Sequence, residues 1–145
     1  MKNSKREEII SHSAKKLFDI VVDIDSYPEY IPWCSKMVIN QRNENEIYAD
    51  MYVKYKLILT QKFGSHVKYN RNNLTIQTNY VEGPLKDLTT NWSFVEIDKH
   101  NSKIIFNVNF EFKNLFHQKI AEAFYPLIEN KMIDSFKKRA DDLLD

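Results

Sequence analysis

The sequence predicts an α+β fold in which a curved antiparallel sheet wraps around one long C-terminal helix. Apolar and polar residues alternate over most of residues 36–112, whereas apolar residues recur at spacings of three and four over Asn114–Leu144. Alternation is typical of half-buried antiparallel strands, and the longer spacing is typical of an amphipathic helix. Strands followed by a last helix are the element order of α+β domains. With 145 residues, the chain is expected to form a single domain, residues 1–145.

Short elements are expected before the alternating region. We predict a strand over Arg6–Ser11 and a helix over Ser13–Val22, where the Ser13 side chain can cap the helix N-terminus. Asp23–Cys34 contains two prolines and is typical of turns, with space for a short second helix. The apolar residues that recur at helical spacing in the first helix are Ala14, Leu17, Phe18 and Val21.

Six strands are expected between Lys36 and Phe112, which with the first strand makes a sheet of about seven. The clearest is Lys103–Phe112, where the apolar residues Ile104, Phe106, Val108, Phe110 and Phe112 share one face. A turn is expected near Lys56, because the stretch up to Tyr69 is too long for one strand. The other segments with a period of two are Ile47–Tyr55, Leu74–Tyr80 and Leu88–Phe94.

Glycine is rare, and this excludes two nucleotide-binding motifs. The two glycines, Gly64 and Gly83, are too few for a GxGxxG turn or a phosphate-binding P-loop. Asparagine tolerates positive φ angles better than most residues, so we expect it to replace glycine in turns. The asparagines placed where turns are needed are Asn70, Asn72, Asn73 and Asn101.

The C-terminal helix is predicted over Asn114–Leu144, but Pro126 lies inside it. A proline within a helix removes one backbone hydrogen bond, so the helix either kinks near Glu122–Phe124 or restarts at Pro126. We favour a kink, because Phe124 and Tyr125 would be poor caps. The apolar stripe consists of Ile120, Phe124, Leu127, Ile128, Met132, Phe136, Ala140 and Leu143.

Composition and charge exclude several classes of protein. One cysteine excludes an intramolecular disulfide, and four scattered histidines give no zinc motif, so no metal site is expected. Twenty-one basic and 20 acidic residues give a net charge of +1, which argues against a DNA-binding protein. No signal peptide and no membrane-spanning run is apparent, so a cytoplasmic location is expected.

Three groups of residues have both a chemical and a structural interpretation. Asp23, Asp25 and Glu29 could be acid–base carboxylates, but turn or cap residues are the simpler interpretation. Cys34 could be a nucleophile, although a lone cysteine more often behaves as a small buried apolar residue. The Lys137–Arg139 cluster could contact RNA, although cations also stabilise a helix C-terminus.

A curved sheet and a helix need not fill the space between them, so an apolar cavity is expected there. The aromatic residues on the sheet and helix could line such a cavity, although they could equally be close-packed core. The candidates from periodicity are Trp92, Phe94, Phe106, Phe110 and Phe124.

Four segments together resemble the ubiquinone-binding family of START-like proteins. The most specific is Tyr27-Pro-Glu-Tyr-Ile-Pro-Trp-Cys34, and the likeness extends over nearly the whole chain. This family includes ribosome association toxins and proteins labelled oligoketide cyclase/lipid transport. The chain departs from the family pattern at Leu85, where phenylalanine is usual, and at Pro126. The four segments are Asp23–Cys34, Gly83–Leu88, Phe106–Leu115 and Phe136–Ala140.

The resemblance implies a helix-grip fold and non-catalytic binding of ubiquinone or another lipid, in support of respiratory electron transfer. It also implies transient contact at the periphery of the inner membrane. No cofactor and no catalytic residue are expected. Two alternatives stay open, namely a protein that binds a ribosomal subunit and inhibits subunit association, and a polyketide cyclase-like enzyme with Tyr55, Thr78 or Thr90 as polar groups. The expected ligand-binding residues are Trp33, Tyr55, Phe63, Leu85, Trp92, Phe94, Phe106, Phe110, Phe124, Leu127 and Met132.

Overall fold

A curved antiparallel sheet is the main element of the computed structural model, which describes residues 2–55, 59–83, 85–112, 122 and 130–144. In these ranges seven strands pair in the order β1-β7-β6-β5-β4-β3-β2. The α+β helix-grip prediction is confirmed, as are the six strands after the N-terminal helices. The strands are β1 (Lys2–Ile10), β2 (Cys34–Asn43), β3 (Glu46–Tyr55), β4 (Leu59–Asn70), β5 (Thr75–Glu82), β6 (Leu85–Asp98) and β7 (Asn101–Phe112).

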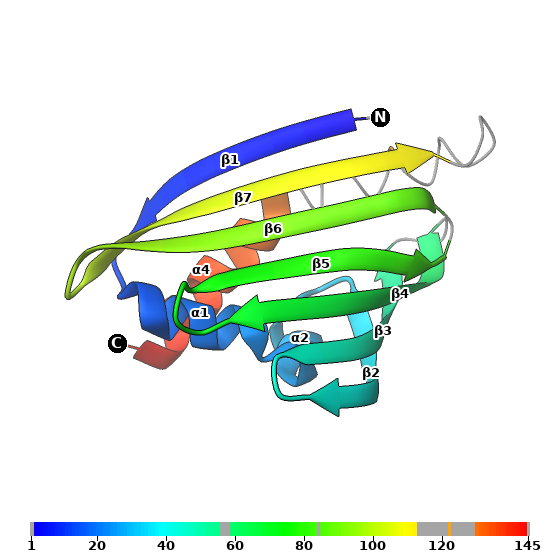
Figure 1. Ribbon diagram of the computed structural model, residues 1–145, viewed down its shortest axis with the longest axis horizontal. Helices are drawn as coiled ribbons and strands as arrows, with labels where there is room; N and C mark the ends of the chain where they lie inside the picture. The colour runs from blue at the N-terminus through cyan, green and yellow to red at the C-terminus, as the bar shows by residue number, and fades with distance from the viewer. Residues whose placement is uncertain (1, 56–58, 84, 113–121, 123–129, 145) are drawn as a thin grey trace.

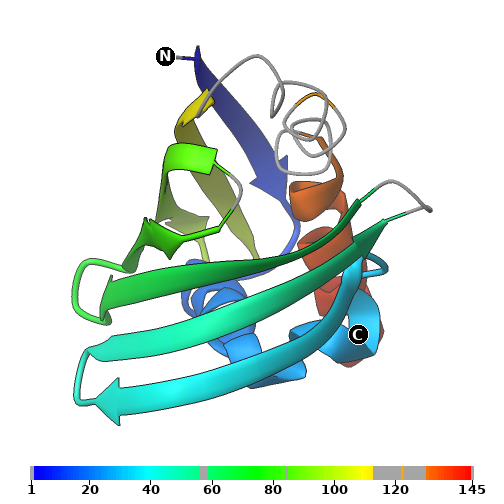
Figure 2. The same cartoon turned by 90° about the vertical axis from the view of Figure 1, so that its right-hand side faces the viewer.

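The helices lie together on the concave side of the sheet, which bends around them (Figures 1 and 2). Helix α1 has Ser13 as its N-cap, and the Ser13 hydroxyl accepts a hydrogen bond from the backbone N–H of Lys16 at 3.3 Å. Its apolar face is buried, with Leu17 and Phe18 at 0% exposure. The remaining elements are η1 (Ile24–Ser26), α2 (Tyr27–Tyr30) and α4 (Met132–Leu144), and α1 spans Ala14–Val22.

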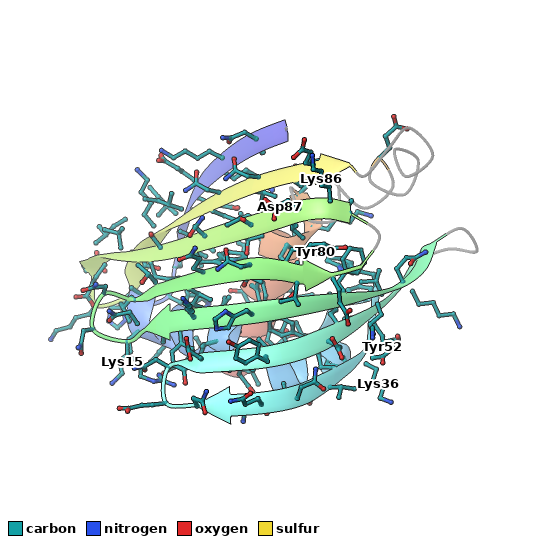
Figure 3. The ribbon with its side chains drawn as sticks, turned by 45° about the vertical axis from the view of Figure 1, so that its right-hand side comes forward. Lys15, Lys36, Tyr52, Tyr80, Lys86 and Asp87 are labelled. Carbon is teal, nitrogen blue, oxygen red and sulfur yellow. The ribbon has the colours of Figure 1, made fainter. Side chains whose placement is uncertain are left out.

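Strand β7 shows why the alternating pattern predicts the sheet. Ile104, Phe106, Val108 and Phe110 are buried on the concave face, and the residues between them are only half-buried. The outer face is mixed, with polar side chains beside exposed apolar ones such as Val95 and Ile97. At its β2–β3 edge the ammonium of Lys36 lies over the ring of Tyr52, 5.6 Å from the centroid (Figure 3).

The turn between β4 and β5 is built differently from the prediction. The side-chain oxygen of Asn70 accepts hydrogen bonds from the backbone N–H groups of Asn72 (2.9 Å) and Asn73 (3.0 Å). The positive φ angle falls on Leu74 (54°) and on none of the asparagines in the described ranges. Leu74 also packs against the core, and its carbonyl accepts a hydrogen bond from the N–H of Phe94. These contacts hold the backbone of Leu74 in a conformation that its side chain disfavours.

Polar contacts join α4 and the residues just before it to β1 and to the segment that follows β1. Arg6 donates to the backbone carbonyl of Asn130 at 3.1 Å, and His12 Nε2 lies 2.8 Å from a carboxylate oxygen of Asp141. The apolar face of α4 is buried through Ile133, Phe136 and Ala140. This confirms the C-terminal part of the predicted helix, whereas the predictions about Pro126, Phe124 and Leu127 lie outside the described residues. Within the described ranges, no helix has the length and hydropathy needed to cross a membrane.

Candidate ligand-binding cavity

A cavity of about 110 Å³ lies between the concave face of the sheet and helices α1, α2 and α4. Strands β2–β7 contribute its floor, and the helices contribute the opposite wall. Most of its lining is apolar. The described lining residues are Val21, Ile24, Tyr27, Met37, Ala49, Met51, Phe63, Ser65, Val67, Ile76, Thr78, Leu88, Thr90, Trp92, Phe106, Met132 and Phe136.

An aromatic wall forms one side of the cavity. Trp92 on β6 lies directly opposite Phe106 on β7, and their rings stack with centroids 4.0 Å apart. Phe136 from α4 meets Trp92 edge-on at 5.3 Å and the ring of Tyr27 at 5.4 Å. The last helix and the α2 segment therefore close the cavity over the sheet.

Methionine side chains provide an adaptable part of the lining. Met37 on β2 and Met51 on β3 are directly opposite each other, and Met132 comes from α4. Unbranched thioether side chains repack more easily than branched or aromatic ones. This part of the wall can therefore adjust to ligands of different shape.

The α2 segment holds α4 in place. The Arg139 guanidinium lies 4.7 Å from the centroid of the Tyr30 ring and 3.7 Å from a carboxylate oxygen of Glu29. Tyr27 donates a hydrogen bond from its hydroxyl to the carbonyl of Val21. Burial raises the pKa of both Tyr27 and Tyr30 above the usual value, so both stay neutral at physiological pH.

The structure separates the expected site residues into three groups. Phe63, Trp92, Phe106 and Met132 line the cavity. Trp33, Leu85, Phe94 and Phe110 are buried but are not among its lining residues. Phe124, Leu127 and the side chain of Tyr55 lie outside what the structure describes.

Trp33 occupies the core rather than the cavity. Its side chain is 2% exposed, and its backbone carbonyl accepts a hydrogen bond from the N–H of Lys54 at 2.8 Å. The indole N–H has no partner within the described ranges. The structure thus places Trp33 in the buried core.

Several lining residues were not predicted, although the alternating pattern contained them. Ala49 and Met51 lie on the alternating face of β3, and Ile76 lies on that of β5. None of these side chains is aromatic, whereas the prediction rested mainly on aromatic residues. Ser65 was not among the predicted polar residues, whereas Thr78 and Thr90 were named as polar candidates for a cyclase, and all three line the cavity.

The carboxylates considered for catalysis make separate structural contacts. Asp23 accepts a hydrogen bond from the Ser26 hydroxyl at 2.7 Å, and Asp25 pairs with Arg42 at 3.0 and 3.1 Å. Neither lines the cavity. Cys34 is 3% exposed, and burial raises the pKa of its thiol to about 11, so it is protonated at neutral pH.

Comparisons with known proteins place this chain in a family. A family model described as "Polyketide cyclase / dehydrase and lipid transport" matches residues 10–137. The ribosome association toxin RatA of Rickettsia prowazekii is 29% identical over 99% of both chains. The mitochondrial coenzyme Q-binding protein COQ10 of Drosophila melanogaster is 27% identical over 90% of this chain and 55% of its own length. The Zhui aromatase/cyclase from a Streptomyces species superposes with a TM-score of 0.90 over 99% of this chain and 96% of its own, and at 11% identity this likeness shows the fold alone.

Proposed function

The chain belongs to the polyketide cyclase/dehydrase and lipid transport family, and on that premise we propose that it binds a hydrophobic ligand in the cavity without catalysing a reaction. The apolar cavity between the sheet and α4 is the observation that carries the proposal. The described lining residues include no carboxylate, imidazole or amine that could transfer a proton near neutral pH. Their main polar groups are hydroxyls and the indole N–H of Trp92, which can orient a ligand.

The size of the cavity limits what it can enclose. An engineered cavity of about 150 Å³ binds benzene, and the space of about 110 Å³ between the described lining residues is of the same order, so it suits a single ring. A long isoprenoid chain exceeds that space. If the ligand is ubiquinone, we propose that its ring occupies the cavity and that its tail extends beyond it.

A cavity-filling substitution tests this function. Ala49 lines the cavity and is 3% exposed, so Ala49→Leu should fill the ligand's space with little strain. We expect this variant to lose binding of a ubiquinone that has one isoprene unit, as measured by calorimetric titration. Any apolar compound that organic extraction and mass spectrometry detect in the parent should be absent from the variant. The parent should bind this ubiquinone.

Ala140→Leu is the matched control for this substitution. Ala140 is 0% exposed and does not line the cavity, so its enlargement should lower the free energy of unfolding by about 1–3 kcal/mol. Binding at 25 °C should stay at the parental level while the variant is folded. Parental binding by Ala49→Leu, or no binding by the parent, would contradict the proposed function.

We further propose that the cellular partner is a ribosomal subunit rather than the respiratory chain. The relative named as a ribosome association toxin aligns over 99% of both chains, whereas the coenzyme Q-binding relative aligns over 55% of its own length.

Sedimentation of ribosomes tests this partner. Purified bacterial subunits are mixed at a magnesium concentration that allows partial association, with and without the protein, and separated on a sucrose gradient. We expect the protein to reduce the associated fraction and to sediment with one subunit. An unchanged profile at a tenfold molar excess of protein would refute the ribosomal partner and leave the ligand-binding proposal intact.

A further inference from the structure

Three hydroxyl side chains lie next to one another on the floor of the cavity. Ser65, Thr78 and Thr90 belong to the adjacent strands β4, β5 and β6, and all three line the cavity. Thr78 and Thr90 are directly opposite each other in the β5–β6 ladder, a relation that places Cβ atoms about 4.5–5.5 Å apart. Ser65 is opposite Tyr80, so it is a diagonal neighbour of Thr78.

These hydroxyls interrupt rows of apolar side chains. Val67 on β4 is opposite Thr78, and Val108 on β7 is opposite Thr90. Valine has nearly the shape of threonine and suits a strand equally well, so it would fit these positions without a polar atom. All three residues are half-buried, and a hydroxyl in a mostly apolar cavity has few neighbouring groups with which to hydrogen-bond.

None of the three hydroxyls has a hydrogen-bond partner within the part of the chain that the structure describes. The phenol of Tyr27, by contrast, donates to a backbone carbonyl. The hydrogen-bonding capacity of Ser65, Thr78 and Thr90 is therefore available to whatever occupies the cavity.

We propose that Ser65, Thr78 and Thr90 form a hydroxyl strip that recognises an oxygen substituent on the ligand. The inference rests on the proposed ligand-binding function and narrows it to a single ring that carries a carbonyl or hydroxyl oxygen. A hydroxyl both donates and accepts, so the strip suits either oxygen. Charged ligands are disfavoured, because the described lining residues offer no opposite charge to a buried ion.

Three small probes separate the contribution of the oxygen from that of the apolar ring. p-Cresol carries a hydroxyl, 4-methylcyclohexanone carries a carbonyl, and toluene carries neither. Their affinities are measured by calorimetry for the parent and for variants with Thr78→Val and Thr90→Val, singly and combined. Each lost hydrogen bond should weaken an oxygenated probe roughly two- to tenfold and leave toluene binding unchanged or tighter. The probe that loses affinity identifies which oxygen the strip prefers.

Thr89→Val is the matched control, because Thr89 precedes Thr90 on β6 and does not line the cavity. It should change none of the three affinities. If the parent binds toluene but the double variant binds p-cresol and the ketone as the parent does, the strip is refuted and the ligand-binding function stands. If the parent binds none of the probes, the proposed function fails together with the strip. Toluene binding shows that the cavity is intact in each variant. If the double variant does not fold, Ser65→Ala tests the strip with the same three probes.

Discussion

Phe136 is the side chain of α4 whose removal should most affect the closure of the cavity. It is 1% exposed, and its ring contacts those of Tyr27, Tyr30 and Trp92 at centroid distances of 5.4, 5.9 and 5.3 Å. Truncating a buried phenylalanine to alanine typically lowers the free energy of unfolding by about 3–5 kcal/mol. We expect Phe136→Ala to lie in the upper part of this range.

The structure supports a large effect because the space left by the ring cannot close. Three aromatic rings surround it, and it adjoins a cavity of about 110 Å³ that is already present. Rigid rings relax less than flexible side chains, and the cost rises by about 24 cal/mol for each Å³ of residual cavity. Since domains are typically stable by about 5–15 kcal/mol, the variant should retain only part of its stability.

Urea unfolding at equilibrium measures this loss, provided that the parent and the variant have the same m-value. Leu143→Ala on the same helix is the control, because Leu143 is 55% exposed and its truncation should change the free energy of unfolding by less than about 0.5 kcal/mol. Toluene at 100 times its dissociation constant should restore about 2.7 kcal/mol to Phe136→Ala. A loss below about 1 kcal/mol would refute the tight packing of α4 against Tyr27 and Trp92.

Two further predictions concern backbone geometry and pH. Gly83 has a φ of 147°, and a Cβ there would lie 2.8 Å from the carbonyl oxygen of Lys62, so Gly83→Ala should lower the free energy of unfolding by more than about 1 kcal/mol. Gly64→Ala should cost less in the same urea assay, because its closest contact is the flexible side chain of Glu82 at 3.0 Å, and the reverse order would contradict this explanation. Burial raises the pKa of Cys34 from 9.0 to about 11, so the unfolded chain releases a proton that the folded protein retains, and stability should fall as pH rises from 9 to 11. The fall should be smaller in Cys34→Ala, and equal slopes for parent and variant would exclude this contribution.

The sheet could be predicted from the sequence because one of its faces is buried. Alternation identifies the strands wherever side chains go alternately to the core and to solvent, as in β7. Strand β1 begins at Lys2 rather than at the predicted Arg6, because its first residues are polar and are held by backbone pairing with β7. Backbone pairing leaves no apolar pattern in the sequence.

The cavity lining was harder to predict than the sheet, because one alternating face contains both lining and packed residues. Phe94 and Trp92 lie on the same face of β6, but Phe94 packs edge-on against Phe18 of α1 at 6.0 Å. Trp92 lies one row further along the strand and reaches the cavity. The position of the helices over the sheet decides between these outcomes, and the period of the strand does not encode that position.

The contacts that join residues 6 and 12 to residues 130 and 141 also have a consequence for how the chain folds. Arg6 and Asn130 are separated by 124 positions, and His12 and Asp141 by 129. Closing loops of this length is entropically costly and slows folding, so we expect these contacts to form late. Until they form, the apolar concave face lacks the part of its cover that Met132 and Phe136 supply. Late docking of α4 would therefore create an interval in which a newly made chain is prone to aggregate and in which chaperones would be needed.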